Sequence, residues 1–146
     1  MSFSDIAGAV ASRVSFAMRI TNSAGAHAGY DAELTAQAIL NLTIRGVWTR
    51  DEVDRFFAAL TPLYHEARRR SGTTRTLVVV ETVQSPAIAL HVRSHALALK
   101  QPGDRRAFVV ASFLSKLQIR RLATTDAFGL FTDRSTAERW LLGQAA

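Results

Sequence analysis

The sequence predicts a single α/β domain whose mixed β-sheet carries helices on both faces. Three observations indicate this class. Two stretches between residues 30 and 45 alternate apolar and polar side chains, as in a half-buried hairpin. After residue 46, helical and strand patterns alternate in the order βαβαβα, which is typical of α/β folds. The chain has 146 residues, 48% of them hydrophobic, which is enough to bury one core.

Residues 1–29 differ from the rest because they are rich in Ala, Ser and Gly. We expect a leader that is loosely packed or forms a short helix, followed by one domain over residues 30–146. Residues 6–10 are apolar, but they are too few to span a membrane and no basic segment precedes them. We therefore expect neither a secretory signal nor a transmembrane segment.

The hairpin is expected over residues 30–34 and 38–45. The first helix then begins at a capping box formed by Thr49 and Glu52, beside a hydrophobic staple of Trp48 and Val53. Apolar residues follow at helical spacing as far as residue 71. Pro62 lies inside this helix and predicts a kink or a stepped last part.

Net charge is +6, yet the only dense basic run, residues 68–70, falls where the first helix ends. Cations at that place complement the negative end of the helix dipole, so the charge does not predict binding of nucleic acid. The chain has no cysteine, which excludes disulfides, thiol nucleophiles and cysteine zinc sites.

The remaining elements follow in regular alternation. Residues 76–80 form an unbroken β-branched and aliphatic run, as in a strand covered on both faces. Further strands are expected at 107–111 and 128–132, and helices at 86–100, 114–123 and 134–142. Right-handed crossovers should place the helices on both faces of the sheet.

Two short motifs add a family resemblance. Residues 45–49 read Arg-Gly-Val-Trp-Thr at a strand end before the long helix, and residues 130–133 read Leu-Phe-Thr-Asp before Ala137 and Trp140. Their order over residues 30–143 resembles the SpoIIAA-like, STAS-type proteins. The resemblance implies a bacterial, cytoplasmic, non-enzymatic regulatory module that binds a protein partner.

STAS-type antagonists carry a phosphorylatable serine in an Asp-Ser-Ser-Gly element after a buried strand. This chain reads Glu-Thr-Val-Gln-Ser-Pro at residues 81–86 instead. Ser85 lies near the matching place and is the phosphorylation candidate that the resemblance implies. The same serine, followed by Pro86, also has the features of a helix N-cap.

Ligands of open α/β sheets bind beyond the carboxyl ends of the strands. The candidates at that rim are Glu81, Thr82, Ser112 and Asp133. Glu81 could act as a general base if it were desolvated, but no Gly-rich phosphate loop or nucleophile elbow accompanies it. We therefore expect no enzymatic activity and no cofactor.

His91 and His95 stand four residues apart and share one face of the second helix. Such a pair can bind a metal, but the sequence indicates no third ligand. A pair of histidines at the edge of the core is the preferred interpretation, and we expect no metal site.

The second helix is apolar on two sides, since Leu90 and Leu97 lie opposite the stripe of Ile88, Val92 and Leu99. The second side could be a homodimer seam, a groove for a protein partner, or a surface covered by residues 1–29.

STAS-type domains also resemble lipid-transfer folds, and this resemblance implies an alternative function as a carrier of a small apolar ligand or lipid. It would use a pocket between the first two helices, edged by arginines.

Overall fold

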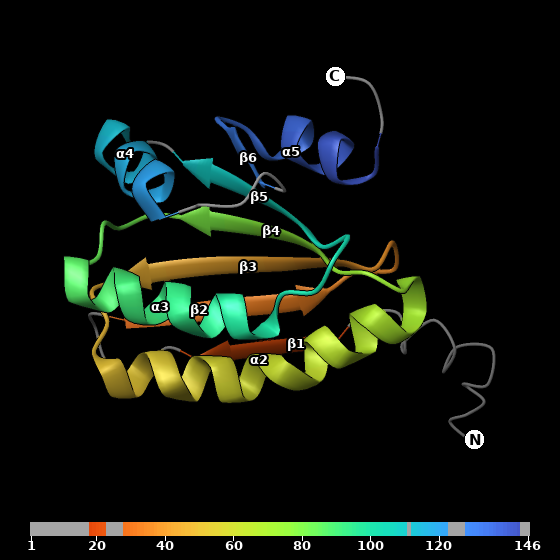
Figure 1. The fold of residues 1–146 in the computed structure, drawn as a ribbon, viewed down its shortest axis with the longest axis horizontal. Coiled ribbons are helices and arrows are strands. Elements are labelled where there is room, and N and C mark those ends of the chain that lie inside the picture. Colours follow the sequence, from red (N-terminus) through yellow and green to blue (C-terminus); the bar gives the residue numbers. More distant parts are fainter. Residues whose placement is uncertain (1–17, 23–27, 111, 123–127, 144–146) are drawn as a thin grey trace.

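The structure of the chain is a computed structural model that describes residues 18–22, 28–110, 112–122 and 128–143 (Figure 1). Strands and helices alternate as the sequence predicts, so the expected α/β class is confirmed. The strands are β1 (Met18–Asn22), β2 (Ala28–Leu34), β3 (Ile39–Gly46), β4 (Arg75–Val80), β5 (Arg105–Val110) and β6 (Phe128–Phe131). The helices are α2 (Arg50–Ser71), α3 (Pro86–Leu99), α4 (Phe113–Leu122) and α5 (Arg134–Leu141).

The described strands form one mixed sheet in the order β1-β2-β3-β4-β5-β6. β1, β2 and β3 pair antiparallel, and β3 to β6 pair parallel. The predicted hairpin is β2–β3, and its turn is closed by Thr35, whose backbone carbonyl accepts from the amide of Ala38 at 2.9 Å. Ala38 adopts a φ of 62°, the left-handed value that the turn requires although no glycine is present.

Residues 18–22 differ from the expected leader, because they form the edge strand β1 along β2. The stretch contains Ile20 and Thr21, which suit a strand, but the surrounding Ala, Ser and Gly hid this short pattern. Residues 1–17 and 23–27 of the same expected leader lie outside the described residues.

Helices cover both faces of the sheet, although not by alternate crossovers. α2 and α3 pack on one face against Leu40 and Leu42, and α4 lies on the same side beside α3 (Figure 1). Among the described helices, α5 alone covers the other face, where Ala137 and Leu141 pack against Leu77. Each parallel strand is added on the same side of the preceding one, so crossovers of one hand leave their helices on one face.

The start of α2 confirms the sequence prediction. Thr49 Oγ1 accepts from the Glu52 amide at 3.2 Å, and Glu52 Oε1 accepts from the Thr49 amide at 2.7 Å. Trp48 and Val53 are both buried beside this capping box. The helix passes Pro62 without a break, and its second half is inclined to the first (Figure 1).

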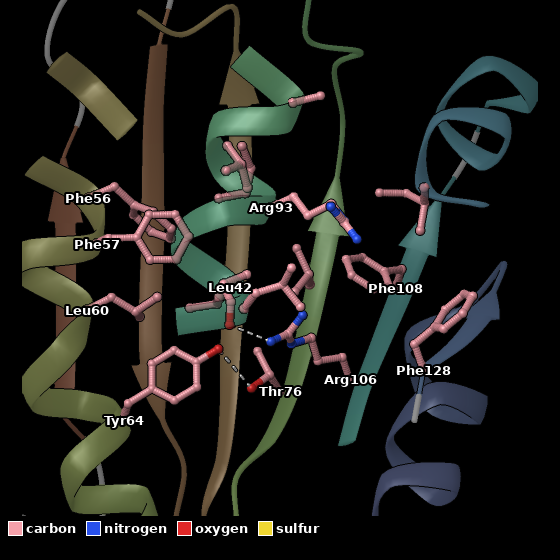
Figure 2. A pocket seen from close by; sticks show the side chains of 17 residues that line it. Leu42, Phe56, Phe57, Leu60, Tyr64, Thr76, Arg93, Arg106, Phe108 and Phe128 are labelled. Carbon is pink, nitrogen blue, oxygen red and sulfur yellow. Dashed lines mark hydrogen bonds between the residues drawn. The ribbon is translucent and has the colours of Figure 1, made fainter. Parts of the chain in front are cut away.

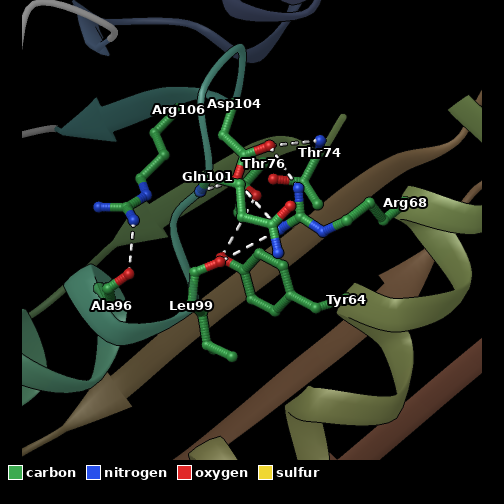
Figure 3. Close-up of polar contacts among 9 residues, drawn as sticks. All are labelled: Tyr64, Arg68, Thr74, Thr76, Ala96, Leu99, Gln101, Asp104 and Arg106. Carbon is green, nitrogen blue, oxygen red and sulfur yellow. Dashed lines mark hydrogen bonds and ion pairs between the residues drawn. The ribbon is translucent and has the colours of Figure 1, made fainter. Parts of the chain in front are cut away.

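A buried ion pair fastens the end of α2 to the turn before β5 (Figure 3). Arg68 Nη1 and Nη2 donate to the two oxygens of Asp104 at 2.9 and 3.1 Å, and Nη2 also donates to the Leu99 carbonyl. The amides of Thr74 and Gln101 donate to the same carboxylate at 2.9 and 2.8 Å. Asp104 is 2% exposed, and these bonds compensate the cost of burying its charge.

Candidate functional site: an apolar cavity beneath two helices

A cavity of about 150 Å³ lies between α2, α3 and the sheet (Figure 2). The aromatic residues Phe56, Phe57 and Tyr64 of α2 form one wall, and Phe108 of β5 and Phe128 of β6 stand on the opposite side. The alternative function given above requires a pocket in this place, between the first two helices. The structure therefore contains a pocket in the place that this function requires.

The cavity exists because α3 presents small side chains to the sheet. Ala89 and Ala96 line it where a larger aliphatic residue would fill the space, and Ala89 is the helix's one buried residue. The space left by these small side chains is apolar and partly open to solvent, so a ligand could enter it.

The cavity has a polar side formed by two arginines, Arg93 of α3 and Arg106 of β5. Arg106 Nη2 donates to the Ala96 carbonyl at 2.8 Å, as Figure 3 shows. Among the described residues, Arg106 has no carboxylate partner. Thr76 Oγ1 donates to the hydroxyl of Tyr64 at 3.5 Å in the same wall. A half-buried guanidinium that lacks a counter-ion in this part of the chain favours an anionic group in the cavity.

A second apolar cavity of about 110 Å³ adjoins the first toward the carboxyl ends of the strands. The two share Phe56, Val92 and Phe108 among their walls, and the second adds Trp48. Trp48 packs edge-on against Phe56 at 5.1 Å between ring centroids.

The rim residues predicted from the sequence divide into two groups. Thr82 Oγ1 accepts from the Gly46 amide at 3.2 Å, so it ties two loops together, while Glu81 is exposed. Ser112 and Asp133 line one open pocket of mixed polarity at the ends of β5 and β6. The structure thus brings Ser112 and Asp133 together and leaves the other two outside their pocket.

These polar rim residues mainly hold helix starts. Asp133 is the N-cap of α5 and accepts from the Thr136 amide at 2.8 Å, and Ser112 Oγ accepts from the Ser115 amide at 3.0 Å. Ser85, the phosphorylation candidate, is the N-cap of α3 and accepts from the Ile88 amide at 3.3 Å. The capping interpretation of Ser85 is therefore confirmed.

The two leucines predicted as an association surface are exposed on α3, Leu90 by 55% and Leu97 by 39%. Their opposite stripe, Ile88 and Val92, packs against the core as expected. The two leucines differ in one respect. Leu97 is exposed and also lines the cavity, whereas Leu90 is exposed and does not line it.

The predicted histidine pair has a third neighbour that the sequence did not reveal. Asp54 of α2 places Oδ1 at 2.6 Å from His91 Nε2 and 2.8 Å from His95 Nε2. Hydrogen bonds from His95 and then His91 hold the pKa of the Asp54 carboxyl below its usual range. The structure thus brings to the histidine pair a third possible ligand that the sequence did not indicate, and the expectation of no metal site stays a prediction.

Comparisons with known proteins give no match to any family model, curated protein or solved structure. The resemblance to the SpoIIAA-like proteins therefore stays a prediction from sequence. Within the described part of the chain, no helix combines the length and apolar character needed to cross a membrane.

Proposed function

We propose that the chain binds a small apolar molecule that carries a negative charge, and that it acts as a carrier or sensor of this ligand. The cavity beneath α2 and α3 is the observation that supports the proposal. An engineered apolar cavity of about this volume takes up benzene, so one aromatic ring or a short acyl chain is the appropriate size.

The charge of the ligand follows from the polar side of the cavity. Arg106 offers a guanidinium to this space, and a carboxylate there would accept charge-assisted hydrogen bonds. The aromatic and aliphatic walls would hold the rest of the ligand through burial of apolar surface. A neutral molecule of the same shape would gain only the second contribution.

Benzoate, benzyl alcohol and benzylamine form a suitable probe series, because they share one ring and differ in charge. We expect benzoate to bind most tightly and benzylamine least. Heteronuclear NMR of the full chain should place the shifted resonances around Val92 and Phe108. Shifts distributed over the whole surface, or equal affinities for the three probes, would contradict the proposal.

Two pairs of variants make the test specific. Ala96→Leu fills the cavity and should abolish benzoate binding, whereas Ala98→Leu makes the same change at an exposed position of α3. Arg106→Met should remove the preference for benzoate over benzyl alcohol. Its control is Arg105→Met, since Arg105 lies on the other face, 4.0 Å from the centre of the Trp140 ring.

The second candidate function is the protein-binding module implied by the family resemblance. The exposure of Leu90 and Leu97 on α3 favours it. We infer that a partner, either a foreign protein or a second copy of the chain, would cover Leu90. This surface and the cavity lie on one helix, so a protein partner and a ligand could influence each other.

A further inference from the structure

We propose that Asp54, His91 and His95 form a binding site for a divalent transition-metal ion, with Zn²⁺ as the first candidate. The three side chains come from two helices, and their ligand atoms all lie within 4.8 Å of one another. The proposal does not depend on the ligand of the cavity, so either can fail without the other.

The donor set suits such an ion. Zn²⁺ binds imidazole nitrogen and carboxylate oxygen, and sites with three protein ligands keep a further position for water or another molecule. Both imidazoles direct Nε2 at the same oxygen of Asp54. Two side chains that converge on one point in this way already have the directions that a shared metal ion requires.

The distances allow the ion to enter with a small movement. Ligands about 2.1 Å from a tetrahedral ion lie about 3.4 Å from one another. The present contacts of Asp54 Oδ1 to the two Nε2 atoms, 2.6 and 2.8 Å, must therefore lengthen by less than about 1 Å, and the ligand nitrogens of the two histidines, within 4.8 Å, must approach by up to about 1.4 Å. The Asp54 side chain is 53% exposed and can make this adjustment by rotating toward solvent.

The two imidazoles are held more firmly than the carboxylate. His95 stacks on Phe57 with ring centroids 4.7 Å apart and planes 7° from parallel, and it meets His91 edge-on at 4.9 Å. His91 is only 14% exposed in its side chain. Packing thus restricts the two imidazoles before the ion binds, which lowers the ordering cost of binding.

The three proposed metal ligands lie close to the cavity, so metal binding would affect it. Asp54 belongs to α2 and the histidines to α3, so a bound ion would join the two helices across the seam above the cavity. Phe57 links the two regions, because it stacks on His95 and also lines the cavity. Metal binding would stiffen one wall of the proposed ligand site.

The test uses the full chain, purified without a histidine tag and freed of metal by a chelator. Isothermal titration with Zn²⁺ alone should show one ion per chain. Replacing both His91 and His95 by Ala should weaken binding by at least about 100-fold, since losing even a partner of a ligand costs about 10–100-fold. The matched control, His27→Ala with His65→Ala, removes the other two histidines and should leave the affinity unchanged.

A measurement on the unaltered chain covers the case in which a variant fails to fold. Long-range ¹H–¹⁵N spectra report each imidazole nitrogen, and Zn²⁺ should shift Nε2 of His91 and His95 and leave His65 in place. Asp54→Asn should weaken binding by about tenfold or more. A chain that takes up no stoichiometric Zn²⁺, or one whose histidine signals do not move, would show that the three residues are only a hydrogen-bonded link between helices.

Discussion

Two polar links tie α2 to residues that follow it in the chain: Arg68 to Asp104, and Asp54 to the histidines of α3. The two carboxylates differ in burial and in how many hydrogen bonds they accept. At the end of α2, the Asp104 carboxylate is 2% exposed and accepts from Arg68 and two backbone amides. Near its start, the Asp54 side chain is 53% exposed and meets two imidazoles at one oxygen. The first link has the features of a fixed structural fastening, and the second has room for an additional atom.

This difference indicates which of the two links can change with solution conditions. The guanidinium of Arg68 makes a two-point contact with the buried carboxylate, so the link is expected to weaken only when Asp104 is protonated at low pH. Imidazoles and an exposed carboxylate can bind a metal ion, so the second link can respond to one. The Arg68–Asp104 link is thus expected to stay fixed, whereas a metal ion could alter the link at Asp54. The cavity lies between these two links.

The largest expected effect comes from breaking the buried link. Asp104→Ala should destabilise the chain by about 3–5 kcal/mol, because it leaves Arg68 in a largely buried position without its partner. Urea unfolding followed by circular dichroism measures the change. Asp54→Ala is the control at the other link and should shift the midpoint far less. Equal losses from the two variants would mean that both links are structural in the same way.

Zinc should act at the exposed link alone. With free Zn²⁺ at about 100 times its Kd, the metal site would add about 2.7 kcal/mol to the free energy of unfolding. Asp104→Asn should show the same gain, since Asp54 and Arg68 are separated by about 21 Å along α2 and distant sites are additive. Thermal melts with and without Zn²⁺ check this. A gain that disappears in Asp104→Asn would show that the two ends are coupled.

Acid should weaken the buried link between Arg68 and Asp104. Burial raises the pKa of Asp104, but the Arg68 hydrogen bond and the amides of Thr74 and Gln101 lower it, and the net shift is downward. The folded pKa is thus below the unfolded one, so the stabilisation is present above the unfolded pKa and is lost as pH falls through the folded value.

The window for this loss lies below about pH 4, the usual range of an aspartate. Urea unfolding at a series of pH values measures the free energy of unfolding of the natural chain and of Asp104→Asn. The difference between the two should decrease as the pH falls through this window. The Glu66 carboxyl, with a pKa lowered to about 2 by Arg69 and then Arg70, remains ionised over most of this window. A gap that stays constant with pH would contradict the assigned role of Asp104.

The smallest effect on stability is expected from Leu90→Glu. The residue is 55% exposed and does not line the cavity, so its replacement should change the free energy of unfolding by no more than about 0.5 kcal/mol. It should nevertheless abolish self-association if α3 is a homodimer seam. Sedimentation of both proteins decides this, and a natural chain that stays monomeric would exclude the homodimer.

Local patterns predicted much of the fold. The capping box at Thr49 and the N-cap at Ser85 were visible because both depend on residues three or four positions apart. The buried positions of α2 follow the predicted helical spacing from Val53 to Ala67. The edge strand β1 was missed, since five residues in a small-residue context carry too little pattern to distinguish a strand from a leader.

The links between helices could not be predicted, because they depend on how separate elements meet. The arginines at residues 68–70 were interpreted as complements of the helix dipole, and nothing local connects Arg68 with Asp104. Asp54 likewise precedes His91 by a helix, a strand and a loop. The sequence predicted where a pocket would lie but not why it forms. The small size of Ala96 leaves a space only once α3 is packed on the sheet.

The strand order has a consequence for synthesis. Each described strand pairs with the one made just before it, and none is inserted between two earlier strands. The sheet can therefore grow by addition at one edge as the chain leaves the ribosome, at about 5–20 residues per second. Until β6 and α5 arrive, β5 presents an open edge that could pair with another chain. β6 then becomes the edge strand, and its four residues offer a shorter edge than the six of β5.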